Sequence, residues 1–107
     1  MSAAKHTPGA ARAAMLALRA RGFAIREAWF RGQYDGMHAI KQVGPHRIEV
    51  YVGSADDGGH YAPVVYLDDV AIARSVATVE KAARIADFRA AVCRAAIARA
   101  EGSANHG

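Results

Sequence analysis

The sequence predicts a single α+β domain in which two terminal helices flank a four- to five-stranded antiparallel β-meander, in two layers. Three observations support this fold class. Apolar residues recur every three to four positions near both ends of the chain, whereas they alternate with polar residues in its middle. Residues typical of turns, mainly Gly, Pro and Asp, separate the central apolar runs. The length of 107 residues suits one domain with one modest core.

The first helix is expected over residues 8–21. Thr7 is a good N-cap, and Pro8 fits the first helical position because no intrahelical N–H donor is needed there. An apolar stripe follows, and Gly22 after basic residues is a helix stop signal. Residues 1–6 carry nothing that would anchor them, so we expect them to be disordered.

The second helix is expected after Thr78, whose hydroxyl suits an N-cap, and Glu80 in the first turn favours the positive end of the helix dipole. Its core stripe is predicted from the spacing of its apolar residues: Ile85, Phe88, Val92 and Ala95 or Ala96. Gly102 is the expected stop, which makes residues 102–107 a disordered tail and places the folded domain at residues 7–101.

The sheet is predicted most clearly by RIEVYV, residues 47–52, which alternates in polarity. Ile48, Val50 and Val52 share one face, and Tyr51 lies on the other. This is the pattern of a half-buried antiparallel strand. The apolar face of this strand must be buried against other elements, and the apolar stripes of both helices can pack on it. We therefore expect both helices on one face of the sheet.

Four further strands complete the predicted meander. They are expected at residues 23–30, 37–43, 62–67 and 70–73. The segment 23–30 fits either a helix or a strand, and its aromatic residues and its place after a glycine stop favour a strand. Gly44-Pro45-His46 and Asp68-Asp69 have the composition of tight turns.

The stretch SADDGGHY, residues 54–61, is interpreted as a hairpin loop between two strands. Its adjacent carboxylates do not follow the alternating ligand spacing of a calcium loop, and no terminal Glu is present. The lysine of a phosphate-binding loop is also absent. Asp and Gly are the residues that such a turn uses for local hydrogen bonds and positive φ.

No catalytic, cofactor or metal site is predicted. His38, His46 and His60 are separated by intervals that match no ligand motif. No serine lies in a nucleophile elbow. Cys93, the single cysteine, lies in an alanine-rich run and is expected to be a small buried packing residue.

Charge divides the chain into regions. The formal net charge is +4, and the excess is concentrated in the helical ends, because residues 1–26 hold five basic and no acidic residues. Residues 27–73 hold seven acidic and three basic residues. A basic helix can contact phosphates or an acidic protein surface. The candidate nucleic-acid contacts are Arg12, Arg19, Arg74 and Lys81.

No stretch approaches the length of apolar sequence that crosses a bilayer, so no membrane association is expected. Arginines interrupt the apolar segment near the N-terminus, which does not fit a secretory signal. The sequence therefore predicts a soluble, cytoplasmic protein.

The leading function hypothesis is a non-enzymatic protein-interaction module. Trp29, Tyr51 and Tyr66 are the candidate interaction surface, on an exposed sheet face that meets an unknown protein partner or a second copy. The alternative is a nucleic-acid-binding domain that uses its basic helices. An enzyme ranks third and would require a pocket with convergent polar groups.

Two resemblances accompany this interpretation. YDGMHAIKQV, RIEVYV, DDGGHYAPVVYL and TVEKAARIADFRAAV together resemble small, uncharacterised bacterial α+β domains with a β-meander and a C-terminal Ala/Arg-rich helix. That resemblance implies a fold and a bacterial cytosolic setting. GPHRIEVYVG more weakly resembles the loop and second strand of double-stranded RNA-binding domains, in which His46 would enter the minor groove. The basic cluster that opens that family's second helix is reduced here to Arg74 and Lys81.

Overall fold

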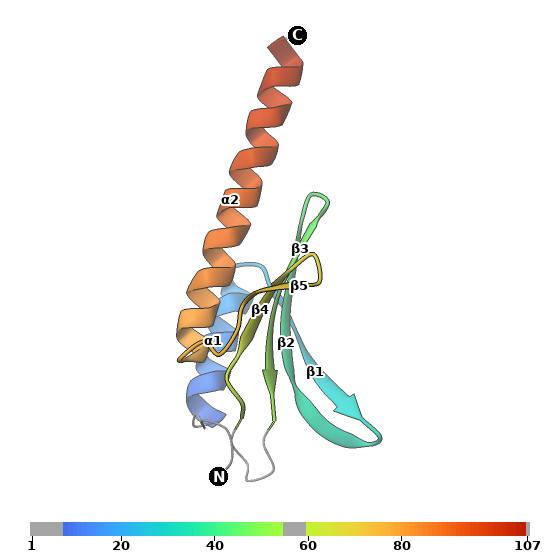
Figure 1. Ribbon diagram of the computed structural model, residues 1–107, viewed down its shortest axis with the longest axis vertical. Coiled ribbons are helices and arrows are strands. Elements are labelled where there is room, and N and C mark those ends of the chain that lie inside the picture. Colours follow the sequence, from blue (N-terminus) through green and yellow to red (C-terminus); the bar gives the residue numbers. More distant parts are fainter. Residues whose placement is uncertain (1–7, 55–59, 107) are drawn as a thin grey trace.

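Two helices lie on one face of an antiparallel sheet, and no described element covers the other face (Figure 1). The computed structural model describes residues 8–54 and 60–106. Within these residues the sheet has five strands in the order β1-β2-β3-β4-β5. The elements in chain order are α1 (Pro8–Ala20), β1 (Ala24–Phe30), β2 (Gln33–Val43), β3 (His46–Gly53), β4 (Val64–Leu67), β5 (Val70–Ala73) and α2 (Val79–His106). The predicted α+β meander between two helices is confirmed.

The strands differ from their predicted bounds where turns and proline intervene. β1 is a strand, so the favoured interpretation of residues 23–30 is confirmed. β2 begins earlier than expected, at Gln33, because Arg31 and Gly32 have positive φ values of 51° and 78° and form a tight turn. β4 begins only at Val64, after Pro63, which has no N–H for a ladder hydrogen bond.

The acidic pair between β4 and β5 forms a tight turn. Asp68 and Asp69 have φ values of 51° and 67°, the conformation of a type I′ hairpin turn between β4 and β5. Ser54 pairs with His60 in an isolated antiparallel bridge, which extends the β3–β4 pairing toward the SADDGGHY loop. Residues 55–59 of that loop, with Asp56 and Asp57, lie outside the described residues.

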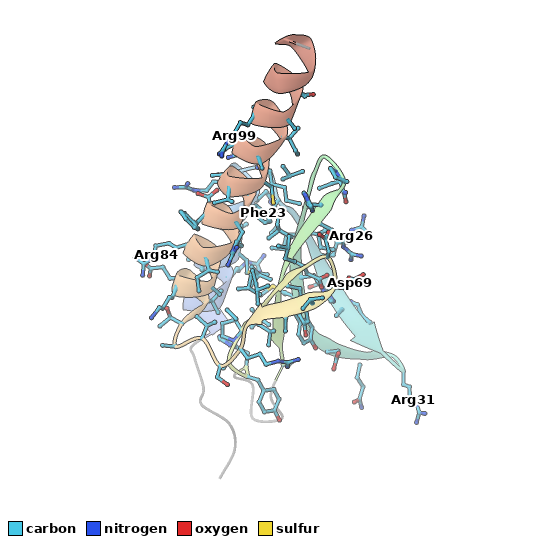
Figure 2. The ribbon with its side chains drawn as sticks, turned by 45° about the horizontal axis from the view of Figure 1, so that its top comes forward. Phe23, Arg26, Arg31, Asp69, Arg84 and Arg99 are labelled. Atoms are coloured by element: carbon cyan, nitrogen blue, oxygen red, sulfur yellow. The ribbon has the colours of Figure 1, made fainter. Side chains whose placement is uncertain are left out.

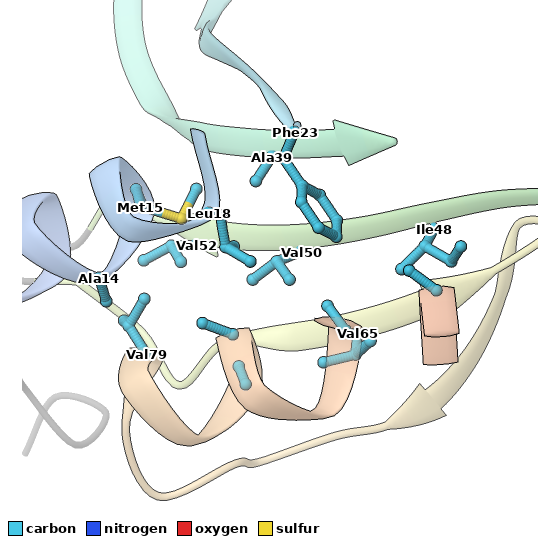
Figure 3. Packing of buried hydrophobic residues seen from close by; sticks show 14 of the residues in the cluster. Ala14, Met15, Leu18, Phe23, Ala39, Ile48, Val50, Val52, Val65 and Val79 are labelled. Carbon is cyan, nitrogen blue, oxygen red and sulfur yellow. The ribbon is translucent and has the colours of Figure 1, made fainter. Parts of the chain in front are cut away.

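The core fills the space between the helices and the inner face of the sheet (Figure 3). Ile48, Val50 and Val52 of β3 are buried, as the alternation of that strand predicts. Met15 and Leu18 of α1 pack into the same cluster. The inner face of β3 is therefore the centre of the core.

The stripe predicted to bury α2 is wrong except at Ile85, which is half-buried and packs against the core. Phe88 is 66% exposed and Val92 is 41% exposed. The buried face of α2 consists instead of Val79, Ala82, Ala83, Ala86, Ala90 and Cys93. This second stripe has the same helical spacing, and its small side chains let the helix axis approach the sheet and α1 closely. Cys93 is a buried packing residue, as predicted.

The start of α2 is as predicted, but its end is not. The backbone N–H of Lys81 donates to Thr78 Oγ1 at 3.0 Å, which confirms the N-cap. Gly102 does not stop the helix, which continues to His106, so the predicted helix end at Gly102 is wrong. Disorder of residues 102–107 stays a prediction. A single glycine costs a helix only about 1 kcal/mol and does not end it without a capping contact. Gly107 and residues 1–7, including the expected cap Thr7, lie outside the described residues.

Neither described helix combines the length and the apolarity that a membrane span requires. The C-terminal part of α2 projects beyond the sheet (Figure 1). The helix contacts the sheet at the β2–β3 turn, where Ile97 lies over Gly44. Gly44 has a φ of 57°, and a Cβ atom placed there would lie 2.5 Å from Ile97 Cδ1. The turn therefore favours glycine both for its backbone and for the close approach of α2.

The end of α1 is held by charged groups from two elements. Lys41 Nζ, on the helix-facing side of β2, donates to the Arg21 carbonyl oxygen at 2.7 Å and lies 5.5 Å from the Phe23 ring centroid. Arg21 Nη1 lies 2.5 Å from Asp87 Oδ2 on α2. A cation at the C-terminal end of a helix is favourable because the carbonyls there are unpaired within the helix.

Two glycine substitutions are expected to have opposite effects on stability. Gly44→Ala should lower the free energy of unfolding by about 1–2 kcal/mol, because alanine is strained at positive φ. Gly102→Ala should raise it by a few tenths to about 1 kcal/mol, because alanine favours a helix and nothing lies within 4 Å of the new Cβ. Urea unfolding of both variants measures the difference. Equal effects in the two variants would contradict this account of the turn.

Candidate binding site on the open sheet face

The open face of the sheet carries the side chains that alternate with the core residues. The register places His38 opposite Tyr51, and Glu49 opposite both Ile40 and Tyr66. These residues come from β2, β3 and β4, and all are half-buried. Strand pairing alone thus brings polar and aromatic groups from three strands together.

A depression of about 380 Å³ lies on this face. Its lining residues are Asp35, His38, Glu49, Tyr51, Tyr66 and Asp69. Figure 2 shows Asp69 and Arg26 on the side of the sheet away from α2, whereas Arg84 and Arg99 project from the helix. The depression is therefore open to a partner that approaches from the sheet side.

The floor of the depression is a connected polar network. His38 Nδ1 lies 2.5 Å from Glu49 Oε2, and Arg47 Nη2 donates to Glu49 Oε1 at 3.2 Å. The His38 ring also packs against Tyr51, with centroids 4.9 Å apart. Both oxygens of Glu49 are thus occupied, and its carboxylate holds the imidazole and the guanidinium in place.

Tyr51 extends the network to the rim. Its hydroxyl donates to Asp35 Oδ2 at 3.0 Å, and it lies 3.2 Å from the Asp35 carbonyl oxygen. The ring lies over Gly53, where an added Cβ would be 3.3 Å from the hydroxyl oxygen. Gly53 pairs with Gly36, so this end of the β2–β3 ladder has no side chains to separate Tyr51 from Asp35.

The opposite rim is fixed by the Asp68-Asp69 turn. Asp68 Oδ1 accepts a hydrogen bond from the Arg47 backbone N–H at 2.9 Å, and Asp68 Oδ2 accepts one from His46 Nδ1 at 2.9 Å. The His46 bond and then the Arg47 N–H hold the pKa of Asp68 below its ordinary value of 3.8. The next residue, Asp69, is placed with Oδ1 3.8 Å from Arg47 Nη1.

The lining favours a cationic group. Three carboxylates line the depression, and the described lining residues include no lysine or arginine. Two tyrosine rings and the imidazole add faces on which a cation or its aliphatic stem can lie. Arg47, at the edge, offsets part of the negative charge through its contacts with Glu49 and Asp69.

The imidazole–carboxylate pair also resembles the arrangement that orients a general base. The described lining residues include no Ser, Thr or Cys that His38 would activate as a nucleophile. That the chain is not an enzyme stays a prediction.

The histidines considered as metal ligands are not brought together. His38 contacts Glu49, His46 contacts Asp68, and His60 is buried with Nδ1 3.1 Å from the Tyr61 carbonyl oxygen. Among the residues of known placement, no group of three or more His, Cys, Asp or Glu side chains could hold a metal ion.

Two of the three predicted interaction residues lie at the depression, and the third does not. Tyr51 and Tyr66 line the depression, whereas Trp29, which is 60% exposed, lies on β1 and is not among the lining residues. Sequence reasoning missed Asp35, Glu49 and Asp69. Glu49 was readable from the alternation of β3, but the positions of the two aspartates depend on turn geometry.

The predicted nucleic-acid contacts lie on separate elements. Arg12 and Arg19 are seven residues apart, close to two full turns, and therefore share a face of α1. Arg74 precedes α2, and Lys81 lies in its first turn. None of the four lines the groove where the two helices meet.

Comparison with known proteins adds no relative: the chain matches no protein-family model, and neither a curated protein nor a solved structure is significantly similar to it. The small α+β fold is as expected. The bacterial setting and the resemblance to double-stranded RNA-binding domains gain no support.

The pH dependence of stability follows from Asp68. The pKa of Asp68 is lower in the folded chain than in the unfolded chain. Its contribution to the free energy of unfolding is therefore fully present above the ordinary pKa of 3.8, and it is lost as the pH falls through the lowered pKa of the folded chain. Asp68→Asn should therefore flatten the loss of stability in acid, measured as the free energy of unfolding in urea from pH 6 down to pH 2. An unchanged slope in this variant would show that the His46–Asp68 contact is not maintained in solution.

Proposed function

We propose that this protein is a non-enzymatic interaction module that binds a basic segment of a partner protein on the open face of its sheet. The observation that carries the proposal is the depression between β2, β3 and β4, in which carboxylates and tyrosine rings converge. A lysine or arginine side chain is the protein group that satisfies both, because its stem packs on rings and its charge pairs with carboxylates.

The rigidity of the lining supports the proposal. Tyr51 is held by Asp35, and Glu49 by His38 and Arg47, so the groups need little ordering when a partner binds. Preorganised groups lose less side-chain entropy on association, which favours affinity. Asp69, at the exposed rim, is the carboxylate through which an incoming cation would first be attracted.

Nucleic acid stays the alternative partner. A phosphate would meet three carboxylates at the depression, so this alternative depends on the helices and not on the sheet. The contacts would come from exposed basic residues: Arg12 and Arg19 on α1, Arg74 before α2 and Lys81 in its first turn. Such binding would weaken steeply with salt, because neutralised phosphates release counterions.

The test is a chemical-shift titration of the isotope-labelled full chain with a short unstructured peptide rich in Lys and Arg. The amide signals of Glu49, Tyr51, Tyr66 and Asp69 should move, and an acidic peptide of equal length should leave them unchanged. Tyr66→Ala should weaken binding by roughly 2- to 10-fold, the range expected for loss of one cation–aromatic contact.

Two charge variants provide the matched control. Asp69→Asn and Glu101→Gln each remove one negative charge, but only Asp69 lines the depression. Asp69→Asn should weaken peptide binding and Glu101→Gln should not. Equal effects would indicate attraction by net charge alone. The proposal would be replaced by the nucleic-acid alternative under two results together. The basic peptide would cause no chemical-shift changes, and duplex RNA or DNA would cause salt-sensitive shifts at Arg12, Arg19, Arg74 and Lys81.

A further inference from the structure

The outer face of α2 carries larger apolar side chains than its buried face. The buried stripe is mostly alanine, whereas Phe88 and Val92 point away from the core, 66% and 41% exposed. A phenylalanine ring that stays largely in water forgoes the favourable free energy of its burial. The exposed Phe88 is therefore a natural anchor for an interface.

Beside Phe88 lies a groove between α1 and α2, with a volume of about 360 Å³. Its apolar walls are formed by small side chains and one ring: Ala14, Ala17, Ala83, Ala91 and Phe88. The groove thus offers a hollow of alanines directly next to a projecting ring. One patch of the surface carries both a knob and a hole.

The rim of the groove carries charges of both signs. They are Arg21, Glu80, Arg84 and Asp87, two cations and two anions. A partner with charge of one sign would meet repulsion at half of this rim. A second copy would not, because a two-fold axis brings each patch against itself and can set each cation opposite an anion.

The sequence positions fit such an axis. If two α2 helices run antiparallel so that Arg84 of each copy faces Asp87 of the other, the same register places Phe88 of each copy opposite Ala83 of the other. Ala83 is a wall of the groove, so each ring would enter the hollow of the other copy. The charge pairing and the knob-in-hole packing therefore require one and the same register.

We infer that the chain forms a two-fold symmetric dimer through the α1–α2 groove and Phe88. The two helical layers face each other, so the open sheet faces point outward on opposite sides. The dimer is separate from the proposed binding of basic segments, and it would present two copies of that site to one partner.

Sedimentation velocity of the full chain over a concentration series tests the inference. The wild type should shift toward twice the monomer mass as concentration rises. Phe88→Ser should stay monomeric and should fold normally by circular dichroism, because two thirds of the side chain is already exposed. Arg84→Glu, which sets like charges opposite each other at Asp87, should also lose the dimer.

Leu16→Ser is the matched control. Leu16 is 42% exposed on α1 and does not line the groove, so this variant should dimerise like the wild type. A wild type that is monomeric at all concentrations would overturn the inference, as would a dimer that survives both Phe88→Ser and Arg84→Glu. Monomeric Phe88→Ser should still bind the basic peptide at a single site, so failure of the dimer and failure of the sheet-face site are distinguishable.

Discussion

The rotation of α2 about its own axis is the constraint on which the rest of the structure depends. The helix turns an alanine-lined face, with Ala82, Ala86 and Ala90, toward β3 and α1. Small side chains allow close approach, and dispersion contacts over a long helix compensate for the small area that each alanine buries. Gly44 continues this close contact at the β2–β3 turn, where Ile97 packs over it. The core is consequently thin, and two of the larger apolar residues of α2, Phe88 and Val92, are left outside it.

Two outer surfaces of different chemistry follow from this arrangement. On the sheet side, alternation of β2 and β3 presents the polar and aromatic groups of the depression, connected by hydrogen bonds and acidic in balance. On the helix side, Phe88 and the alanine groove form an apolar patch whose rim carries both signs of charge. An acidic, preorganised depression suits a cationic partner, whereas a self-complementary apolar patch suits a second copy. The two proposals therefore use opposite sides of the domain.

The fold was largely predictable from the sequence, because period, caps and turn residues agree along the chain. The Thr78 cap, the inward face of β3 and the positive-φ turn at Asp68-Asp69 follow from local rules. The buried face of α2 was not predictable from spacing, since Ile85-Phe88-Val92 and the alanine stripe have the same period and only packing chooses between them. The binding depression was half predictable: Tyr51 and Tyr66 follow from alternation, whereas Asp35 and Asp69 are positioned by glycine pairing and a hairpin turn.

The reaction of the single cysteine with a thiol reagent in the native state tests the rotation of α2 most directly. Cys93 is 8% exposed on the alanine-lined face, five residues after Phe88 and therefore on a different side of the helix. We predict that Cys93 is labelled slowly in the folded chain and rapidly only in denaturant. The rate of labelling under native conditions should follow the rate or extent of unfolding. Rapid labelling of the folded chain would show that Cys93 faces solvent. It would place the Phe88 stripe in the core and contradict both the packing and the dimer surface derived from it.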